Sequence, residues 1–319
     1  MGINQLCIDK FSSLKLVTFF DMQRWFFVFI RMVVVENMDI VRVINNNNVC
    51  VVNEKGKELI VSGKGIGFSK KPGDKVEASQ IQKTYLIADS KLQERLIYLL
   101  SEIPHGYVEF TNDLVEHIRE VIPEQLNESL LITLSDHLFF AIKRKRKGIE
   151  FSNPMLEALR TCYPDELDLG YYCLEQIKNR LKVEFIPDEA GFIAMHIINA
   201  RLETGMSEVY GITSLINICS DIAMEKFPFI NKNAVSYERY MVHIKYLAQR
   251  IFKNDLFSDY LTEDKTVLVQ LSKKYPEEYE CAQKISDYVA EIKKARLTED
   301  ELFTLVVHIV RMTQERRKI

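Results

Sequence analysis

Two patterns of apolar and polar positions divide the chain near residue 88. Before that point, short runs that alternate apolar and polar residues are separated by turns containing Asn, Gly or Pro, and these runs cover residues 39–44, 49–53, 58–61 and 81–87. They predict four strands of a small antiparallel sheet. Beyond the short linker Ala88–Ser90, apolar residues recur at intervals of three and four, which indicates helices.

The predicted sheet has little material for a core of its own. Four strands fall within the 50 residues 38–87, and a sheet of this size buries too little apolar surface to be stable alone. Pairing with a second copy would enlarge the core. We therefore expect a homodimer.

The first 37 residues differ in texture from the rest of the chain. Residues 14–35 are apolar and aromatic, but four charges interrupt them: Lys15, Asp21, Arg24 and Arg31. A transmembrane helix needs about 20 mostly apolar residues, so these charges argue against a membrane span. A signal peptide also fits poorly, because no small-residue cleavage site follows the apolar part. We interpret residues 1–37 as a leader translated from an upstream start, with the functional protein beginning at Met38. A peripheral membrane helix is the alternative.

Cysteine usage indicates a reducing compartment. The six cysteines are scattered, with no C-x-x-C and no nearby His-rich tract, which lacks the spacing of a zinc site or of a disulfide framework. We expect a cytoplasmic protein that needs no metal and no cofactor.

The charge of the whole chain conceals its distribution. With 42 basic and 45 acidic residues the net charge is −3, which speaks against coating nucleic acid by bulk charge. Residues 38–87, however, contain eight basic and five acidic residues, a net charge of +3, whereas residues 88–319 have a net charge of −7. Nucleic-acid binding is therefore expected of the β segment and not of the helical one.

Two features of the β segment suggest RNA. The Asn run 45–48 offers amides that donate to and accept from bases and 2′-hydroxyls, and the glycines of 63–67 allow close approach to a backbone. Phe68 beside lysines can stack on an unpaired base. Each feature also has a structural interpretation: Asn is frequent in turns, Gly-x-Gly-x-Gly in bends, and Phe68 can be a core residue.

Residues 38–87 closely resemble the co-antiterminator RNA-binding domain that opens the BglG/SacY family of bacterial transcriptional antiterminators. The matching stretches are Val43–Asn47, Val51–Glu58 and Gly63–Asp74. The resemblance implies a four-stranded sheet that dimerises and binds an imperfect RNA hairpin. It also implies contacts to RNA from Arg42, Asn47, Gly63, Lys64 and Phe68, with Asn45 and Lys70 behind them. Lys64 stands where some relatives have Arg, and a lysine ammonium lacks the planar fork that gives Arg its bidentate and stacking geometry.

The helical region repeats itself. At an offset of 112 residues, three segments match: Tyr163–Glu166 with Tyr275–Glu278, Asp188–Glu189 with Asp300–Glu301, and His196–Ile197 with His308–Ile309. Upstream, the segments around His137 and His243 match at an offset of 106. Copies of about 110 residues are too long for solenoid units. The sequence therefore predicts a multidomain chain, with a small four-stranded antiparallel β RNA-binding domain followed by two homologous all-α helical-bundle domains.

Four of the six histidines occupy repeated positions: His137 and His196 in copy one, His243 and His308 in copy two. Each lies in an apolar helical context, where a single histidine is usually a satisfied core residue. Two pairs at equivalent positions favour a shared chemical role. Zinc would need further ligands at zinc-site spacing, and no Cys recurs with both pairs. A neutral imidazole that accepts a phosphoryl group remains.

The two copies resemble paired PRDs, the regulatory domains that the sugar phosphotransferase system (PTS) phosphorylates. Their signature histidines match His137, His196, His243 and His308, although Val242 stands in copy two where copy one has Asp136. We place the RNA-binding domain at 38–90, PRD1 at 91–205 and PRD2 at 206–319. The resemblance implies that a PTS sugar permease phosphorylates copy one to inactivate the protein and that HPr phosphorylates copy two to activate it.

Two local patterns complete the picture. The basic run Lys143–Lys147 suggests an auxiliary RNA contact, but a solvated loop after the His137 helix is the preferred interpretation. Thr298 and Glu301 form the pattern of a capping box at the start of the last helix, and Asp188 is placed to cap its counterpart.

Together these observations predict a non-enzymatic, RNA-binding transcriptional antiterminator of PTS sugar-utilisation genes. One rival is a PRD-containing transcriptional activator that binds DNA, for which the sequence offers neither a helix-turn-helix nor a Walker-type Gly-x-x-x-x-Gly-Lys-[Ser/Thr]. The other is a histidine phosphotransfer protein, which would need an acceptor site or a nucleotide cradle.

Overall fold

A computed structural model describes residues 38–53, 56–85, 90–253, 266–294 and 296–314. The expected leader, residues 1–37, lies outside the described residues. The chain forms two compact units, one up to His105 and one from Gly106 onward. None of the helices in the described ranges is both long enough and apolar enough to cross a bilayer.

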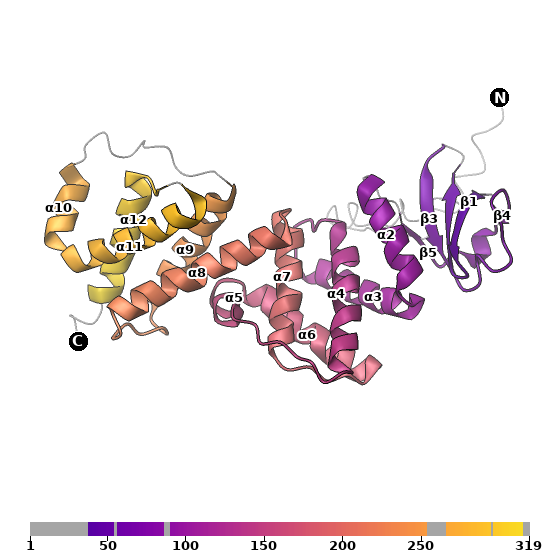
Figure 1. The fold of residues 1–319 in the computed structure, drawn as a ribbon, viewed down its shortest axis with the longest axis horizontal. Coiled ribbons are helices and arrows are strands. Elements are labelled where there is room, and N and C mark those ends of the chain that lie inside the picture. The colour runs from indigo at the N-terminus through magenta and orange to yellow at the C-terminus, as the bar shows by residue number, and fades with distance from the viewer. Residues whose placement is uncertain (1–37, 54–55, 86–89, 254–265, 295, 315–319) are drawn as a thin grey trace, which may run out of the picture. The chain divides into compact units, whose positions relative to one another are not determined.

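The first unit contains the predicted antiparallel sheet (Figure 1). Its strands are β1 (Met38–Asn45), β2 (Asn48–Val52), β3 (Glu58–Ser62), β4 (Lys75–Val76) and β5 (Lys83–Tyr85), in the order β4-β1-β2-β3-β5. The four expected strands are present. A fifth, the two-residue β4, adds to the edge of β1, with Met38 opposite Val76; it is too short to leave an alternating pattern in the sequence.

The two faces of the sheet are covered differently. Alternate residues of the three long strands pack with Ile66 and Val76 in one apolar core, which includes Val49, Val51 and Val61. The opposite face holds Cys50 and Ile60, both buried. Helix α2 (Ser90–Glu102) packs against β1 within this unit. The first helix after the sheet thus groups with the sheet and not with the helical copies, while the expected boundary at residue 90 stays a prediction.

The second unit is helical, and its elements recur in the same order in both copies. Copy one has α3 (His105–Val121), α4 (Ser129–Lys145), α5 (Leu156–Cys162), α6 (Pro164–Leu181) and α7 (Asp188–Leu202). Copy two has α8 (Met206–Lys226), α9 (Val235–Lys253), α10 (Thr266–Lys274), α11 (Pro276–Lys293) and α12 (Glu299–Gln314).

The pair α6 and α11 shows how closely the copies correspond. Each begins with a proline at the first helical position, where the missing N–H costs nothing. Each ends in a lysine with left-handed backbone, Lys182 and Lys294, both with φ of 55°. The expectation of two homologous all-α copies is confirmed.

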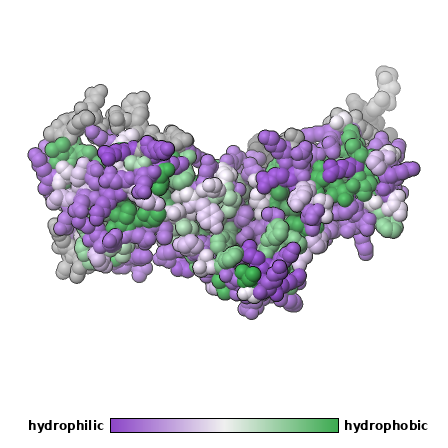
Figure 2. Space-filling model, in the orientation of Figure 1, coloured by the Kyte–Doolittle hydropathy of each residue, from purple (hydrophilic) through white to green (hydrophobic). Residues whose placement is uncertain are grey.

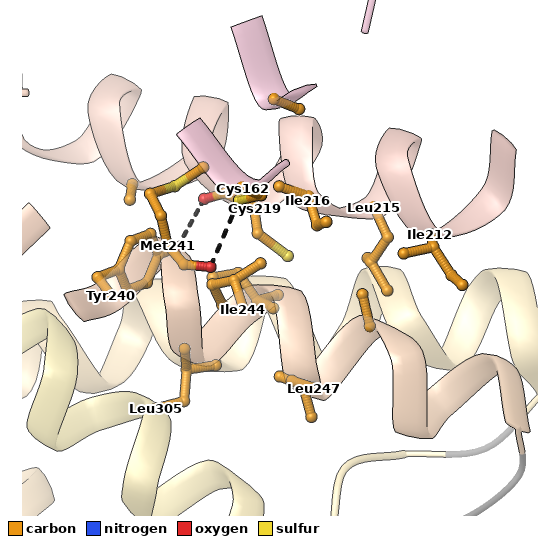
Figure 3. Packing of buried hydrophobic residues seen from close by; sticks show 14 of the residues in the cluster. Cys162, Ile212, Leu215, Ile216, Cys219, Tyr240, Met241, Ile244, Leu247 and Leu305 are labelled. Carbon is orange, nitrogen blue, oxygen red and sulfur yellow. Dashed lines mark hydrogen bonds between the residues drawn. The ribbon is translucent and has the colours of Figure 1, made fainter. Parts of the chain in front are cut away.

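The copies share one apolar core in the described helices. Cys162 and Leu159 of copy one belong to the same buried cluster as the residues that join α8 to α9. Figure 3 shows the side chains of α8 and α9 interdigitating, with Cys162 beside Met241. The Cys162 Sγ contacts the Met241 carbonyl at 3.7 Å, and Lys245 Nζ donates to the Cys162 carbonyl at 2.6 Å, which gives one carbonyl at the end of α5 a partner.

On the face shown in Figure 2, hydrophilic residues predominate and apolar residues gather in separate patches. The five described cysteines are all buried and none forms a disulfide, as small hydrophobic residues would be.

The predicted helix caps are only partly present. Thr298 Oγ1 accepts from the Glu301 N–H at 3.3 Å, which is half of a capping box. The Glu301 carboxylate does not complete the box because Arg250 binds it. The prediction for Asp188 is wrong: this carboxylate accepts from the Asn153 N–H at 2.7 Å and joins the loop before α5 to α7.

Candidate functional sites: a glycine loop and two histidine pairs

The turn between β1 and β2 is built by the Asn45 side chain. Its Oδ1 accepts from the Asn47 N–H at 2.8 Å and from Asn48 Nδ2 at 3.1 Å. Its Nδ2 donates to the Leu100 carbonyl of α2 at 2.7 Å. Both ends of the Asn45 amide are therefore used within the fold. Its role is to shape the turn.

The glycine segment 63–67 lies directly on this turn. The Gly63 N–H donates to the Asn47 carbonyl at 2.9 Å, and the Gly67 N–H donates to the Asn46 carbonyl at 3.0 Å. The Asn47 side chain also takes part, because its Oδ1 accepts from the Gly65 N–H at 2.9 Å. The turn and the loop thus form one surface. With its oxygen engaged by the loop, the Asn47 side chain still has its amide nitrogen to offer a ligand.

The glycines are required by close packing. A Cβ at Gly63 would lie 1.9 Å from the Gln80 carbonyl oxygen, and one at Gly67 would lie 2.2 Å from the Asn45 carbonyl oxygen. Between them Ile66 is fully buried in the core of the sheet. The loop is consequently held at both glycines and by one apolar side chain, in a fixed conformation.

Three side chains of the predicted set extend from this loop. Phe68 is 66% exposed, so the interpretation of Phe68 as a core residue is wrong. Lys64 is exposed, and Lys70 is half-buried with its Nζ donating to the Lys75 carbonyl at 3.1 Å. An exposed aromatic ring between two lysines on a rigid loop provides a stacking surface and positive charge together.

Arg42 is not part of this surface. It pairs in register with Cys50 on β2, whereas the loop covers the face of Val43 and Val49. Directly paired residues share a face, so the Arg42 side chain, although exposed, belongs to the other side of the sheet.

The first histidine pair lies between α4 and α7, which are adjacent (Figure 1). The rings of His137 and His196 have centroids 4.8 Å apart. Glu189, buried on α7, has its Oε1 2.9 Å from His137 Nε2 and 3.5 Å from Arg144 Nη2. At these distances the Glu189 carboxylate can pair with a positive charge on either side chain. One buried carboxylate is thus shared between a histidine and an arginine.

The second pair repeats the arrangement between α9 and α12. The rings of His243 and His308 are stacked, with centroids 4.6 Å apart. Here the equivalent carboxylate, Glu301, accepts two hydrogen bonds of 3.0 Å from Arg250. The structure therefore brings all four predicted histidines together as two pairs, but only copy one places a carboxylate beside a ring.

Burial sets the protonation of these rings. It lowers the pKa of His196 to about 3, with the neighbouring His137 adding to the effect. It lowers the pKa of His243 also to about 3, with His308 and Arg250 contributing. Burial lowers the pKa of His308 as well. At neutral pH these imidazoles are uncharged, as a nucleophilic nitrogen must be.

Sequence reasoning missed the arginines. The basic run predicts a solvated position for Arg144, but Lys143–Lys145 form the last turn of α4. Arg144 contacts Glu189 and the Phe151 ring, and Lys145 pairs with Glu150 at 2.7 Å. The preferred interpretation as a solvated loop is wrong for these residues. A signal was available, because Arg250 follows Arg144 at the same 106-residue offset that relates His137 to His243.

A second buried acid differs between the copies. Glu166 on α6 accepts from Arg201 at 2.7 Å, and Arg201 also pairs with Glu124. Its counterpart Glu278 on α11 accepts instead from the Thr313 hydroxyl at 2.7 Å. Among the described residues no group of three or more His, Cys, Asp or Glu side chains is arranged to hold a metal ion.

Comparison with known proteins assigns both parts of the chain. Residues 38–94 match the model of the CAT RNA binding domain, and residues 112–200 and 213–312 each match the PRD domain. The chain is 36% identical over 279 residues to a protein of Bacillus subtilis (strain 168) named transcription antiterminator LicT, covering 87% of this chain and 100% of that protein.

Two further similarities cover other relatives. A protein of Dickeya chrysanthemi named beta-glucoside operon antiterminator is 36% identical over 280 residues, which is 87% of this chain and 98% of that one. The crystal structure of GlcT CAT-PRDI is 33% identical, covers 52% of this chain and 99% of its own, and superimposes with a TM-score of 0.45.

Proposed function

The chain belongs to the family in which a CAT RNA binding domain precedes PRD domains, and from this premise we propose that it is an RNA-binding transcription antiterminator regulated by histidine phosphorylation. It binds a nascent RNA hairpin that overlaps a terminator, in the cytoplasm and as a homodimer. Binding shifts the competition between two hairpins, and no covalent chemistry on RNA is needed.

The observation that supports RNA binding most directly is the surface made by the Asn46–Asn47 turn and the glycine loop. Asn47 offers an amide nitrogen, Phe68 an exposed ring, and Lys64 a positive charge on a backbone fixed by Gly63 and Gly67. Unpaired bases in a hairpin stack on aromatic rings, and their edges are read by amides. In this proposal Asn45 and Gly63 position the surface, Lys70 supports it, and Arg42 makes a separate contact.

The RNA surface is tested with the full-length protein and the hairpin from the leader of a neighbouring sugar-uptake gene. Replacing Phe68 by Ala removes one stacking platform, worth about 1–3 kcal/mol, which is a roughly 5- to 150-fold rise in Kd. Asn47→Ala should weaken binding comparably because it also releases the Gly65 N–H. Phe140→Ala, an exposed aromatic of α4, is the control and should leave Kd unchanged.

Binding should also weaken steeply with salt, since phosphate contacts release counterions. Unchanged affinity in both loop variants, or binding that is independent of salt, would contradict the proposed surface.

Regulation is proposed to act through the two histidine pairs. A PTS sugar permease phosphorylates His137 and His196 and inactivates the protein, and HPr phosphorylates His243 and His308 and activates it. A phosphoryl group adds close to two negative charges at neutral pH. Beside Glu189 it meets repulsion, and Arg144 and Arg250 are the nearby cations that can pair with it.

Phosphorylation is tested by incubating the protein with HPr, its kinase enzyme and labelled phosphoenolpyruvate. Acid-labile, base-stable label on histidine is expected. A variant with all four histidines replaced by Ala should take up none. Label that persists in that variant, or no label on the native protein, would contradict the regulatory part of the proposal.

A further inference from the structure

The two histidines of each pair present opposite ring nitrogens. In His137 and His243, the first histidine of each copy, Nε2 is buried and makes no hydrogen bond among the described residues. In His196 and His308, the second of each copy, the buried nitrogen is Nδ1. The alternation is the same in both copies although their neighbours differ, so it follows from the antiparallel packing of α4 on α7 and of α9 on α12.

A buried ring nitrogen is a poor nucleophile for an external donor. The attacking atom must hold a lone pair and approach phosphorus from the side opposite the leaving group, which a nitrogen enclosed between two helices cannot do. The other ring nitrogen, Nδ1 in His137 and His243 and Nε2 in His196 and His308, is not among these buried, unpaired atoms. Geometry therefore separates the four acceptors into two chemical kinds.

Glu189 reinforces this choice in copy one. Its Oε1 lies 2.9 Å from His137 Nε2, and although the two atoms do not meet hydrogen-bond geometry, a negative charge at this distance favours the tautomer with the proton on Nε2. That tautomer has its lone pair on Nδ1. In copy two Arg250 donates to both oxygens of Glu301. The Glu301 carboxylate therefore does not act on the tautomer of His243, and the burial of its Nε2 is what remains.

We propose that phosphorylation in this protein alternates between ring nitrogens, at Nδ1 of His137 and His243 and at Nε2 of His196 and His308, and that Glu189 is a positioning residue for His137. This inference rests on the proposed regulation by phosphohistidine and specifies its chemistry.

The step at His137 balances without a further reactant. The Nδ1 lone pair forms a bond to the phosphorus of the donor phosphohistidine, and the P–N bond of the donor breaks with its electron pair returning to the donor imidazole. The bond to phosphorus leaves a positive charge on the His137 ring. That charge is removed when Nε2 loses its proton, which Glu189 is placed to receive.

The experiment uses four full-length variants, each keeping one histidine and replacing the other three by Gln. After phosphorylation by HPr or by the permease domain, ³¹P and ring-¹⁵N NMR identify the bonded nitrogen. Nδ1-phosphohistidine is expected in the variants that keep His137 or His243, and Nε2-phosphohistidine in those that keep His196 or His308. The same nitrogen in all four variants would overturn the inference and leave the proposed function standing, whereas no phosphohistidine in any variant or in the native chain would overturn both.

A second measurement does not depend on phosphorylation or on multiple substitutions. In the native protein with ¹⁵N-labelled histidine rings, the one-proton tautomers should be Nε2–H for His137 and His243 and Nδ1–H for His196 and His308. The opposite assignment would overturn the inference even if a triple variant failed to fold.

Glu189→Gln and the matched control Glu301→Gln test the positioning role. Glu189→Gln should move the His137 ring signals toward the other tautomer and slow its labelling by about tenfold or more, since a histidine in the wrong tautomer loses its nucleophilic geometry. Glu301→Gln should leave the tautomer of His243 unchanged. Equal effects of the two substitutions on the paired rings would show a merely structural role for Glu189.

Discussion

The two histidine pairs are built on the same plan but use their buried carboxylate differently. In each copy two antiparallel helices hold a histidine pair and, seven residues away along each helix, an arginine and a glutamate. In copy one Glu189 is shared between His137 and Arg144. In copy two Glu301 is fully committed to Arg250.

A change in the partners of one buried carboxylate is therefore enough to make duplicated sites chemically unequal. Burial lowers the pKa of His196, the second histidine in copy one, and of His243, the first in copy two, each to about 3. Of the two histidines that come first in their copies, His137 has a buried carboxylate beside its ring, whereas the equivalent carboxylate near His243 is bound by Arg250. A duplication can therefore keep its nucleophiles and still give each copy its own response.

The largest expected effect separates the two arginines. Arg250→Met leaves Glu301 buried without its partner, and breaking such a pair costs about 3–5 kcal/mol. Arg144→Met should cost clearly less, because Glu189 keeps a second polar neighbour, with its Oε1 2.9 Å from His137 Nε2. Urea unfolding of both variants beside the native protein measures the difference. Equal losses would show that Glu189 and Glu301 are held in the same way.

The next effect is the pH dependence of stability. Burial keeps His196 and His243 neutral in the folded protein, with pKa values of about 3, whereas an exposed histidine titrates near 6.5. Below pH 6.5 the unfolded chain binds more protons, so stability falls as pH decreases toward 3. Each histidine contributes up to about 1.4 kcal/mol per pH unit in this window.

The unfolding free energy at pH 7.5, 6 and 5 checks this dependence. His196→Gln and His243→Gln should each flatten the slope by a similar amount, one acting through copy one and the other through copy two. A slope that neither substitution changes would contradict the assigned burial.

A smaller effect concerns the second buried acid. Thr313→Val removes the hydroxyl that donates to Glu278 and should cost about 1–3 kcal/mol. Thr304→Val, on the same helix, loses only a bond to the Asp300 carbonyl and should change stability by about 0.5 kcal/mol or less. Thermal unfolding of the two variants makes the comparison. If Thr304→Val lost as much stability as Thr313→Val, the loss could not be assigned to the bond between Thr313 and the buried Glu278.

The sequence was sufficient to predict features that repeat or alternate. Period-two runs identified the long strands, and the 112- and 106-residue offsets related His196 to His308 and His137 to His243 without a structure. It was insufficient where the contact is between distant segments. Nothing in the pattern shows that Asn45 bonds to Leu100, that Gly63 must clear the Gln80 carbonyl, or that β4 adds to the edge of β1.

Composition was misleading at one place. Five basic residues in a row suggest a solvated segment, but a count of charges along the sequence does not show where each side chain points. On a helix, successive side chains point to different sides. Arg144 points inward to Glu189, while Lys143, Arg146 and Lys147 are exposed. The repeat offset to Arg250 contains the information that the composition of the run lacks.

Transcription through a terminator in a purified system tests the central claim most directly. The template has a hairpin that overlaps the terminator, and a matched template has the hairpin disrupted while the terminator is intact. We predict that the protein raises read-through on the first template only, and that Phe68→Ala abolishes most of the increase. Equal read-through on both templates, or full activity of Phe68→Ala, would contradict the account.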